Sequence, residues 1–162
     1  MSHERGKLTH IGPSGEARMV DVTDKKFSTR TARASGSIRM TEGTLSAIVG
    51  STVGKGDVIG VARLAGIMAA KRTSELIPLC HSLPLTDVQV AIEPDDSLPG
   101  LRAEAVVRTV GPTGVEMEAI TAVAIALVTV YDMAKAIDRN MVISDICLES
   151  KEGGRSGNWQ RG

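Results

Sequence analysis

Residues 116–137, EMEAITAVAIALVTVYDMAKAI, decide the fold. The middle of this stretch is almost entirely apolar, whereas two carboxylates open it and an Asp/Lys pair lies near its end. Asp132 and Lys135 are three residues apart and therefore share one face of a helix. A helix that is apolar on all sides is buried on all sides. Because a two-layer domain leaves one face of such a helix uncovered, we expect burial against another subunit, and hence a homo-oligomer.

The other elements are predicted from alternation, helix caps and turn residues. They are a strand at 29–40, a helix at 41–49 capped by Thr41, a helix at 57–72 capped by Asp57, an extended segment at 76–85, and strands at 86–92, 101–110 and 141–148. This order predicts an α+β fold of the ferredoxin-like (split βαβ) type, an antiparallel sheet with helices packed on one face. We expect a flexible N-terminal arm at 1–18, a single domain at 19–150 and a Gly-rich basic tail at 151–162.

The composition argues against several classes of protein. Nineteen Lys and Arg residues balance nineteen Asp and Glu residues, and one Trp, one Tyr and one Phe offer little stacking surface, so no nucleic-acid partner is expected. The longest apolar stretch is too short to span a bilayer and the first ten residues do not resemble a secretory signal, which predicts no membrane partner and a cytoplasmic location. Two cysteines cannot form a disulfide framework or a paired zinc site.

The reactive groups each have an ordinary structural explanation as well as a functional one. Cys80 and His81 are adjacent in an extended segment and point to opposite faces, so they are not a catalytic dyad. Taken alone, Cys80 is expected in the core, while His81 is either a structural hydrogen-bonding group or a site group. Glu116 and Glu118 either complement the helix dipole or converge on a ligand. The Gly-rich segment 151–157 is either a frayed tail or a loop that binds phosphate through its N–H groups.

Five strings considered together resemble one family. They are KGDV at 55–58, AGIMAAKRTSELIPLCHSLPL at 65–85, GVEMEAITA at 114–122, YDMAKA at 131–136 and KEGGRSG at 151–157. In order and separation they are similar to the cyclic pyranopterin monophosphate synthase family of molybdenum-cofactor biosynthesis, over roughly residues 8–159. Ser82, Ala134 and Arg155 depart from the residues frequent in that family, and none of them removes a proposed catalytic group.

The resemblance implies a lyase that converts 3′,8-cyclo-7,8-dihydro-GTP to cyclic pyranopterin monophosphate with release of pyrophosphate. It implies catalytic roles for Lys55, Asp132 and Lys135, and we expect the two lysines to come from different subunits. The substrate-binding residues that we assign are Lys71, Cys80, His81, Glu116, Met117, Glu118, Lys151 and Arg155.

The family resemblance further implies a homohexamer, built as a trimer of dimers, with the site at a subunit interface. No redox cofactor and no resident metal are expected, although Mg²⁺ could accompany the triphosphate. The competing interpretation is a ferredoxin-like regulatory module that binds a nucleotide without transforming it, because fold alone does not determine function.

Overall fold

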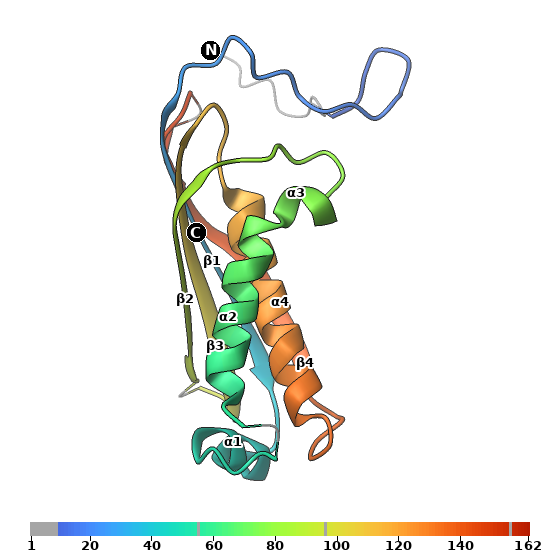
Figure 1. The fold of residues 1–162 in the computed structure, drawn as a ribbon, viewed down its shortest axis with the longest axis vertical. Helices are drawn as coiled ribbons and strands as arrows, with labels where there is room; N and C mark the ends of the chain where they lie inside the picture. The colour runs from blue at the N-terminus through green and yellow to red at the C-terminus, as the bar shows by residue number, and fades with distance from the viewer. Residues whose placement is uncertain (1–9, 55, 96, 156) are drawn as a thin grey trace.

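The helices pack against one side of a single antiparallel sheet (Figure 1). The computed structural model describes residues 10–54, 56–95, 97–155 and 157–162. The strands are β1 (Ser28–Arg39), β2 (Leu85–Pro94), β3 (Gly100–Gly111), β4 (Val142–Glu152) and β5 (Trp159–Gln160), and the helices are α1 (Glu42–Val49), α2 (Val58–Lys71), α3 (Thr73–Leu76) and α4 (Glu116–Ala134). The strand order is β2-β3-β1-β4-β5, so the four long strands have the ferredoxin-like arrangement and the predicted fold class is confirmed.

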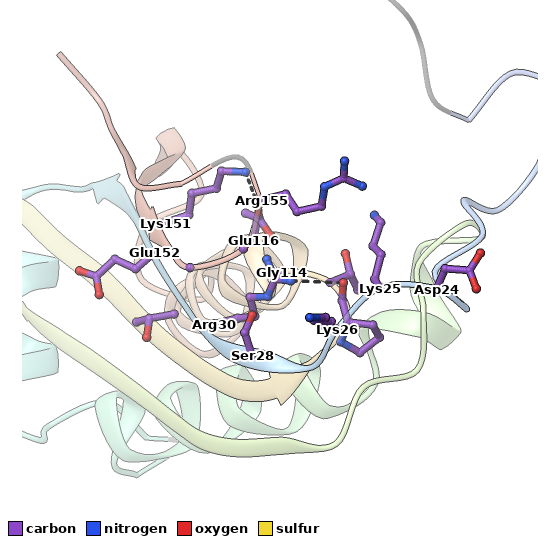
Figure 2. Close-up of a pocket in the computed structure, with 15 residues that line it drawn as sticks. Asp24, Lys25, Lys26, Ser28, Arg30, Gly114, Glu116, Lys151, Glu152 and Arg155 are labelled. Carbon is purple, nitrogen blue, oxygen red and sulfur yellow. Dashed lines mark hydrogen bonds and ion pairs between the residues drawn. The ribbon is translucent and has the colours of Figure 1, made fainter.

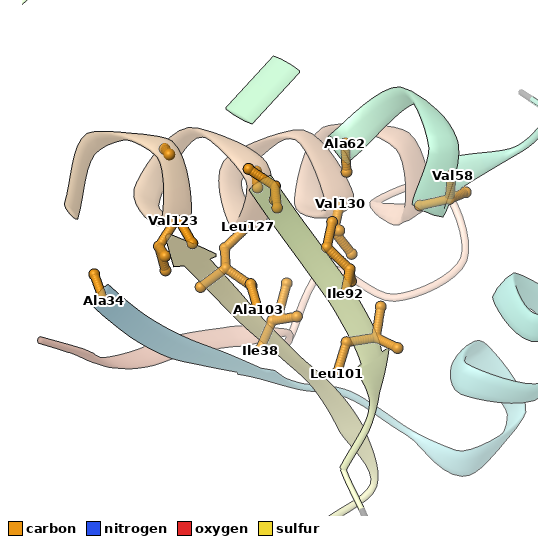
Figure 3. Close-up of a cluster of buried hydrophobic side chains, with 14 of the residues drawn as sticks. Ala34, Ile38, Val58, Ala62, Ile92, Leu101, Ala103, Val123, Leu127 and Val130 are labelled. Atoms are coloured by element: carbon orange, nitrogen blue, oxygen red, sulfur yellow. The ribbon is translucent and has the colours of Figure 1, made fainter. Parts of the chain in front are cut away.

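Alternation along the central strands produces the core. On β1, Ala34 and Ile38 face the helices and are fully buried, as are Leu101 and Ala103 on β3. Figure 3 shows these side chains meeting the inward face of α4, where Leu127 is fully buried. The core therefore lies between the sheet and the helix layer, and α4 is its main helical component.

The two long helices run antiparallel and approach each other closely (Figure 1). A Cβ added at Gly66 of α2 would lie 2.9 Å from the carbonyl oxygen of Ala122 and 3.2 Å from the Cβ of Ala126, both on α4. The small residues of α2 thus pack against a helix as well as the sheet. By length and composition α4 could cross a membrane, but half of its most apolar window is buried inside the domain, as in the core helix of a globular protein.

Both predicted helix caps are confirmed. The Thr41 side chain accepts a hydrogen bond from the Thr44 N–H at 3.2 Å, and the Asp57 carboxylate accepts one from the Gly60 N–H at 2.8 Å. Buried Asp138, in the connection that follows α4, accepts a hydrogen bond from the Thr41 N–H at 3.0 Å. The beginning of α1 is therefore fastened to the end of α4.

The structure differs from the sequence-based prediction mainly near the two ends of the helix layer. The helix α4 ends at Ala134, three residues earlier than predicted, and the short helix α3 precedes the predicted extended segment and includes Leu76. The strand β4 continues to Glu152 instead of ending at Leu148, and β5 pairs with it. Lys151 is consequently a strand residue. The polar sequence of the last four residues of β4 hid this extension, because the strand leaves the apolar core there.

Candidate active site

A pocket of about 830 Å³ opens beyond the first turn of α4. The beginning of α4, the beginning of β1 and the end of β4 surround it, together with the segment that precedes β1 (Figure 2). Five cationic side chains line it, outnumbering three carboxylates: the cations are Lys25, Lys26, Arg30, Lys151 and Arg155, and the carboxylates are Asp24, Glu116 and Glu152. This excess of positive charge favours an anionic ligand.

Sheet alternation explains how β1 contributes to the pocket. Ser28 and Arg30 occupy the same face of β1 as Ala32, which is buried beneath the helices. The strand extends past the first turn of α4, so these two polar side chains reach the pocket instead of the core. The Arg30 guanidinium donates to the Pro112 carbonyl at 3.4 Å, while Arg30 Nε and Ser28 Oγ are buried without a hydrogen-bond partner. Buried polar atoms of this kind are normally satisfied, and here they line the pocket where an anion would satisfy them.

Two glycines bring the end of β4 close to Arg30. Gly153 and Gly154 have φ values of 88° and 83°, a conformation that favours glycine. A Cβ at Gly153 would overlap the Thr29 carbonyl oxygen, and one at Gly154 would overlap the Arg30 guanidinium. The Gly153 N–H donates to the Asn158 side chain at 3.2 Å, so it is already engaged. These glycines therefore allow the end of β4 to approach the beginning of β1 closely.

An ion pair connects α4 with β4 inside the pocket. Lys151 Nζ lies 3.1 Å from Glu116 Oε1, and both side chains are about 70% buried. Figure 2 shows this pair over the beginning of α4, with Arg30 beside it and Arg155 extending from the β4 side. The structure thus brings together three of the predicted substrate-binding residues, Glu116, Lys151 and Arg155.

Glu118 turns inward from the same helical turn. Only 5% of it is exposed, and burial, helped by the neighbouring charge of Glu116, raises the pKa of Glu118 to about 7. Burial and the charge of Glu118 also raise the pKa of the Cys80 thiol. A carboxyl group with such a pKa can hold or release a proton near neutral pH, as acid–base catalysis requires.

The other predicted binding residues lie at this end of α4 without lining the pocket. Lys71 is exposed at the end of α2, and Met117 is 36% exposed on α4. Cys80 is partly exposed, so its predicted place in the core is wrong. His81 Nε2 lies 2.8 Å from the carbonyl oxygen of Val20, so the imidazole has a structural hydrogen bond to the segment before β1.

The predicted catalytic pair occupies the opposite end of α4. Lys135 Nζ lies 2.6 Å from Asp132 Oδ1, and the two side chains are 51% and 58% exposed. At a rise of 1.5 Å per residue this pair is about 25 Å from Glu116 along the helix, so one chain does not place it beside the basic pocket. Lys55 lies outside the described residues. The connection between α1 and α2 lies at the same end of the sheet as the C-terminal end of α4 (Figure 1).

Sequence reasoning missed Asp24, Lys25, Lys26 and Arg30. Arg30 had a recognisable signal, because a charged residue interrupts the apolar face of a predicted strand. The Lys25–Lys26 pair had none, since its segment lacks periodicity and its position depends on the tertiary structure. Within the described ranges, no group of three or more His, Cys, Asp or Glu side chains could hold a metal ion.

Comparison with known proteins shows the family of this chain. A model of the MoaC family matches residues 19–154. The cyclic pyranopterin monophosphate synthases of Brucella ovis and Brucella melitensis are each 59% identical to this chain over 154 residues, covering 95% of this chain and 93% of the relative. The synthase of Brucella canis is 58% identical over the same coverage. With a family match over most of its length and relatives of this similarity, the chain belongs to the MoaC family.

Proposed function

We propose that this protein is a cyclic pyranopterin monophosphate synthase, a lyase that converts 3′,8-cyclo-7,8-dihydro-GTP to cyclic pyranopterin monophosphate and pyrophosphate in molybdenum-cofactor biosynthesis. The observation that carries the proposal is the basic pocket at the beginning of α4. Its five cations suit a triphosphate, and the chain shares 59% identity with proteins that bear this name.

The pocket cations would bind the triphosphate and stabilise the leaving pyrophosphate. Cyclisation joins a hydroxyl oxygen of the substrate to the α-phosphorus, breaks the bond from that phosphorus to the pyrophosphate oxygen and releases the hydroxyl proton. Arg30 suits the phosphate oxygens because its planar guanidinium offers several donors in fixed geometry. Its buried, unpartnered Nε supports this assignment.

Proton transfer would use Lys55, Asp132 and Lys135, with Glu118 holding a proton at the pocket end. Opening and reclosing nitrogen rings requires protons to be delivered and removed at several atoms. Asp132 would orient Lys135 through their ion pair, and Glu116 or Glu118 would face the guanine-derived N–H edge. The proposed surroundings of the substrate also include Lys71, Cys80, His81 and Met117.

The site would be shared between subunits of a homohexamer. About 25 Å separates the two groups of predicted site residues in one chain, which is too far for a single nucleotide-sized substrate to engage both. A partner could place its Asp132–Lys135 pair against the basic pocket. Exposed apolar side chains at Val61, Leu64 and Met68 form a stripe along α2, and this stripe supports an oligomeric state.

Mixing two inactive variants tests this arrangement. Lys135→Ala lacks the amine at one end of α4, and Arg30→Ala lacks a phosphate ligand at the other. With a shared site, random subunit exchange restores about one quarter of wild-type activity, because each functional interface needs one intact half from each chain. No recovery after verified exchange would contradict a shared site.

No resident cofactor is part of the proposal, and magnesium would arrive with the triphosphate as a counter-ion. The described residues do not form a carboxylate and imidazole cluster suited to a resident metal. The balanced overall charge supports the absence of a nucleic-acid partner. A cytoplasmic location and the absence of a membrane partner remain part of the proposal.

The deciding experiment measures pyrophosphate release from 3′,8-cyclo-7,8-dihydro-GTP together with the fluorescence of the oxidised pterin product. Both signals are expected from the wild-type protein, and neither from Lys135→Ala. Tight binding without either signal would favour the nucleotide-binding regulatory module. Unchanged turnover in Lys135→Ala would remove the catalytic role of that lysine.

A further inference from the structure

Residues 135–141, here termed the α4–β4 connection, begin with Lys135 of the proposed catalytic pair. The connection is fixed in the core at both ends, because Ala134 before it is fully buried and Met141 is 6% exposed. Of the residues between these two, only Asp138 is buried, with 7% of it exposed. An acidic residue therefore makes the inner contact of this connection, where an apolar residue would be expected.

The Asp138 carboxylate uses its two oxygens on two different parts of the chain. Oδ1 accepts a hydrogen bond from the Asn140 N–H at 2.9 Å, within the connection itself, and Oδ2 accepts one from the Thr41 N–H at 3.0 Å. Thr41 is the N-cap of α1 and lies 97 residues away in sequence. Figure 1 shows α1 and the α4–β4 connection at the same end of the sheet. Among the described residues, the bond to Thr41 is the hydrogen bond that joins the connection to an element other than α4 and β4.

A local turn alone does not require a charge at position 138. A neutral asparagine side chain accepts the same hydrogen bond from the N–H two residues on. A buried carboxylate just beyond the end of α4 carries two costs, because it loses hydration and faces the negative end of the helix dipole. The second oxygen is needed because a second N–H donor arrives from Thr41, at the beginning of α1, where the helix dipole favours negative charge.

Both sides of this contact are fixed. The Met40 N–H donates to the Pro99 carbonyl at 2.9 Å, so the residue before Thr41 is held to the connection between β2 and β3. On the other side, the Asp138 N–H donates to the Ala134 carbonyl at 3.2 Å, which closes the chain into a turn at the end of α4. The carboxylate therefore ties that turn to a fixed point on the sheet.

We propose that Asp138 is a positioning residue that holds the α4–β4 connection against the beginning of α1 and so keeps Lys135 in place beside Asp132. In this role Asp138 does not touch the substrate and acts through the backbone that carries Lys135. The catalytic part of the inference rests on the proposed function, whereas the mechanical part rests on the hydrogen bonds of the Asp138 carboxylate.

Hydrogen–deuterium exchange of the full-length protein tests the mechanical part. Asp138→Asn keeps the shape of the side chain but leaves one acceptor oxygen for two donors, so exchange of the Thr41 and Asn140 amides is expected to quicken roughly two- to ten-fold. Asp95→Asn is the matched control, because Asp95 also accepts from the N–H two residues on, that of Ser97 at 2.8 Å, in the connection between β2 and β3. This control should leave exchange of the Thr41 amide unchanged. Unchanged exchange of that amide in Asp138→Asn would overturn the proposal.

Steady-state kinetics with 3′,8-cyclo-7,8-dihydro-GTP test the catalytic part. The pocket cations lie at the other end of α4, so Asp138→Asn is expected to lower kcat about ten-fold and to change KM by less than about two-fold. Asp138→Ser is a second variant, because its shorter hydroxyl can close the local turn with Asn140 but cannot also bridge to Thr41. It should lower kcat by a similar factor, while the Asp95→Asn control keeps wild-type values. Wild-type kcat in both Asp138 variants would overturn the positioning role.

A double-mutant cycle with Asp132 separates positioning from a general loss of stability. In an Asp132→Asn background Lys135 has already lost the carboxylate that lies 2.6 Å from its Nζ. Adding Asp138→Asn is therefore expected to lower the remaining turnover by less than about two-fold. A further loss of about ten-fold would mean that the two residues act independently, and would overturn the positioning role.

The two proposals fail in distinguishable ways. If the wild-type protein makes no pterin product, the proposed function fails, while exchange of the Thr41 amide still decides the mechanical role of Asp138. If the product forms with an unchanged kcat in both Asp138 variants, the positioning role fails while the synthase assignment stands.

Discussion

Replacing Glu118 by glutamine should stabilise the protein at alkaline pH and leave it unchanged at acidic pH. Glu118 is 5% exposed, and its pKa rises to about 7 because burial penalises the charged form. Glutamine has nearly the same shape and stays neutral at every pH. The variant therefore isolates the free-energy cost of ionising this one buried group.

The sign and size follow from linkage between protonation and folding. Below the ordinary value of 4.5 the carboxyl is protonated in both states, so its contribution does not change with pH. Between about 4.5 and 7 the unfolded chain releases the proton while the folded protein retains it, so stability falls as pH rises. Above about 7 the carboxyl group is ionised in both states, and the loss of folding stability reaches its full size of roughly 3 kcal/mol.

Urea unfolding at fixed protein concentration between pH 4 and pH 8 measures this difference. The free energies of unfolding of the wild type and Glu118→Gln should agree near pH 4 and diverge by roughly 3 kcal/mol at pH 8. Glu93→Gln, an exposed glutamate on β2, should follow the wild type throughout. Parallel curves for the wild type and Glu118→Gln would refute the argument that burial holds a proton on Glu118.

Three further changes probe the remaining parts of the structure. Asp132→Asn breaks an ion pair whose side chains are both more than half exposed, so the free energy of unfolding should stay within about 1 kcal/mol of wild type while turnover falls at least about 100-fold. A large loss of stability would mean that the pair is structural. Leu127→Ala empties a fully buried position and should lower the free energy of unfolding by about 3 kcal/mol, and a change below about 1 kcal/mol would contradict the core packing described. Gly153→Ala, at a φ of 88° and against the Thr29 carbonyl oxygen, should destabilise the protein by at least about 1 kcal/mol and raise KM because the strand end that carries Lys151 shifts. Wild-type stability and kinetics in Gly153→Ala would refute the need for glycine there.

The parts of the fold that depend on local rules were predictable. The caps at Thr41 and Asp57 follow from side chains that bond to nearby N–H groups, and β1 follows from alternation over a buried face. The end of β4 was not predictable in this way. Its last residues pair with β1, for example Glu152 with Thr31, but their side chains lie beyond the core and carry no apolar signal.

The pocket itself depends on register, which sequence periodicity does not reveal. Antiparallel pairing of β1 with β4 places the beginning of one strand beside the end of the other, so Arg30 and Lys151 meet although more than 100 residues separate them. Motifs singled out Lys151 and Glu116 as site candidates without indicating that they form an ion pair. Lys25 lies in the irregular segment before β1, where the Val20 carbonyl oxygen bonds to His81, 61 residues away in sequence, and local periodicity gives no sign of such a contact.

The first turn of α4 assigns opposite tasks to two glutamates that are two residues apart. Glu116 points into the pocket and pairs with Lys151 at 3.1 Å, so it faces a cation. Glu118 points into the domain, where burial raises its pKa to about 7 even though a helix N-terminus normally favours a charged carboxylate. Burial therefore outweighs the helix dipole at Glu118. Carboxyl groups whose environments differ in this way suit different steps of acid–base chemistry, one as a fixed charge and the other as a proton carrier. The first turn of α4 thus carries an ion-paired carboxyl group in the anion-binding pocket and, two residues later, a buried carboxyl group whose pKa is raised to about 7.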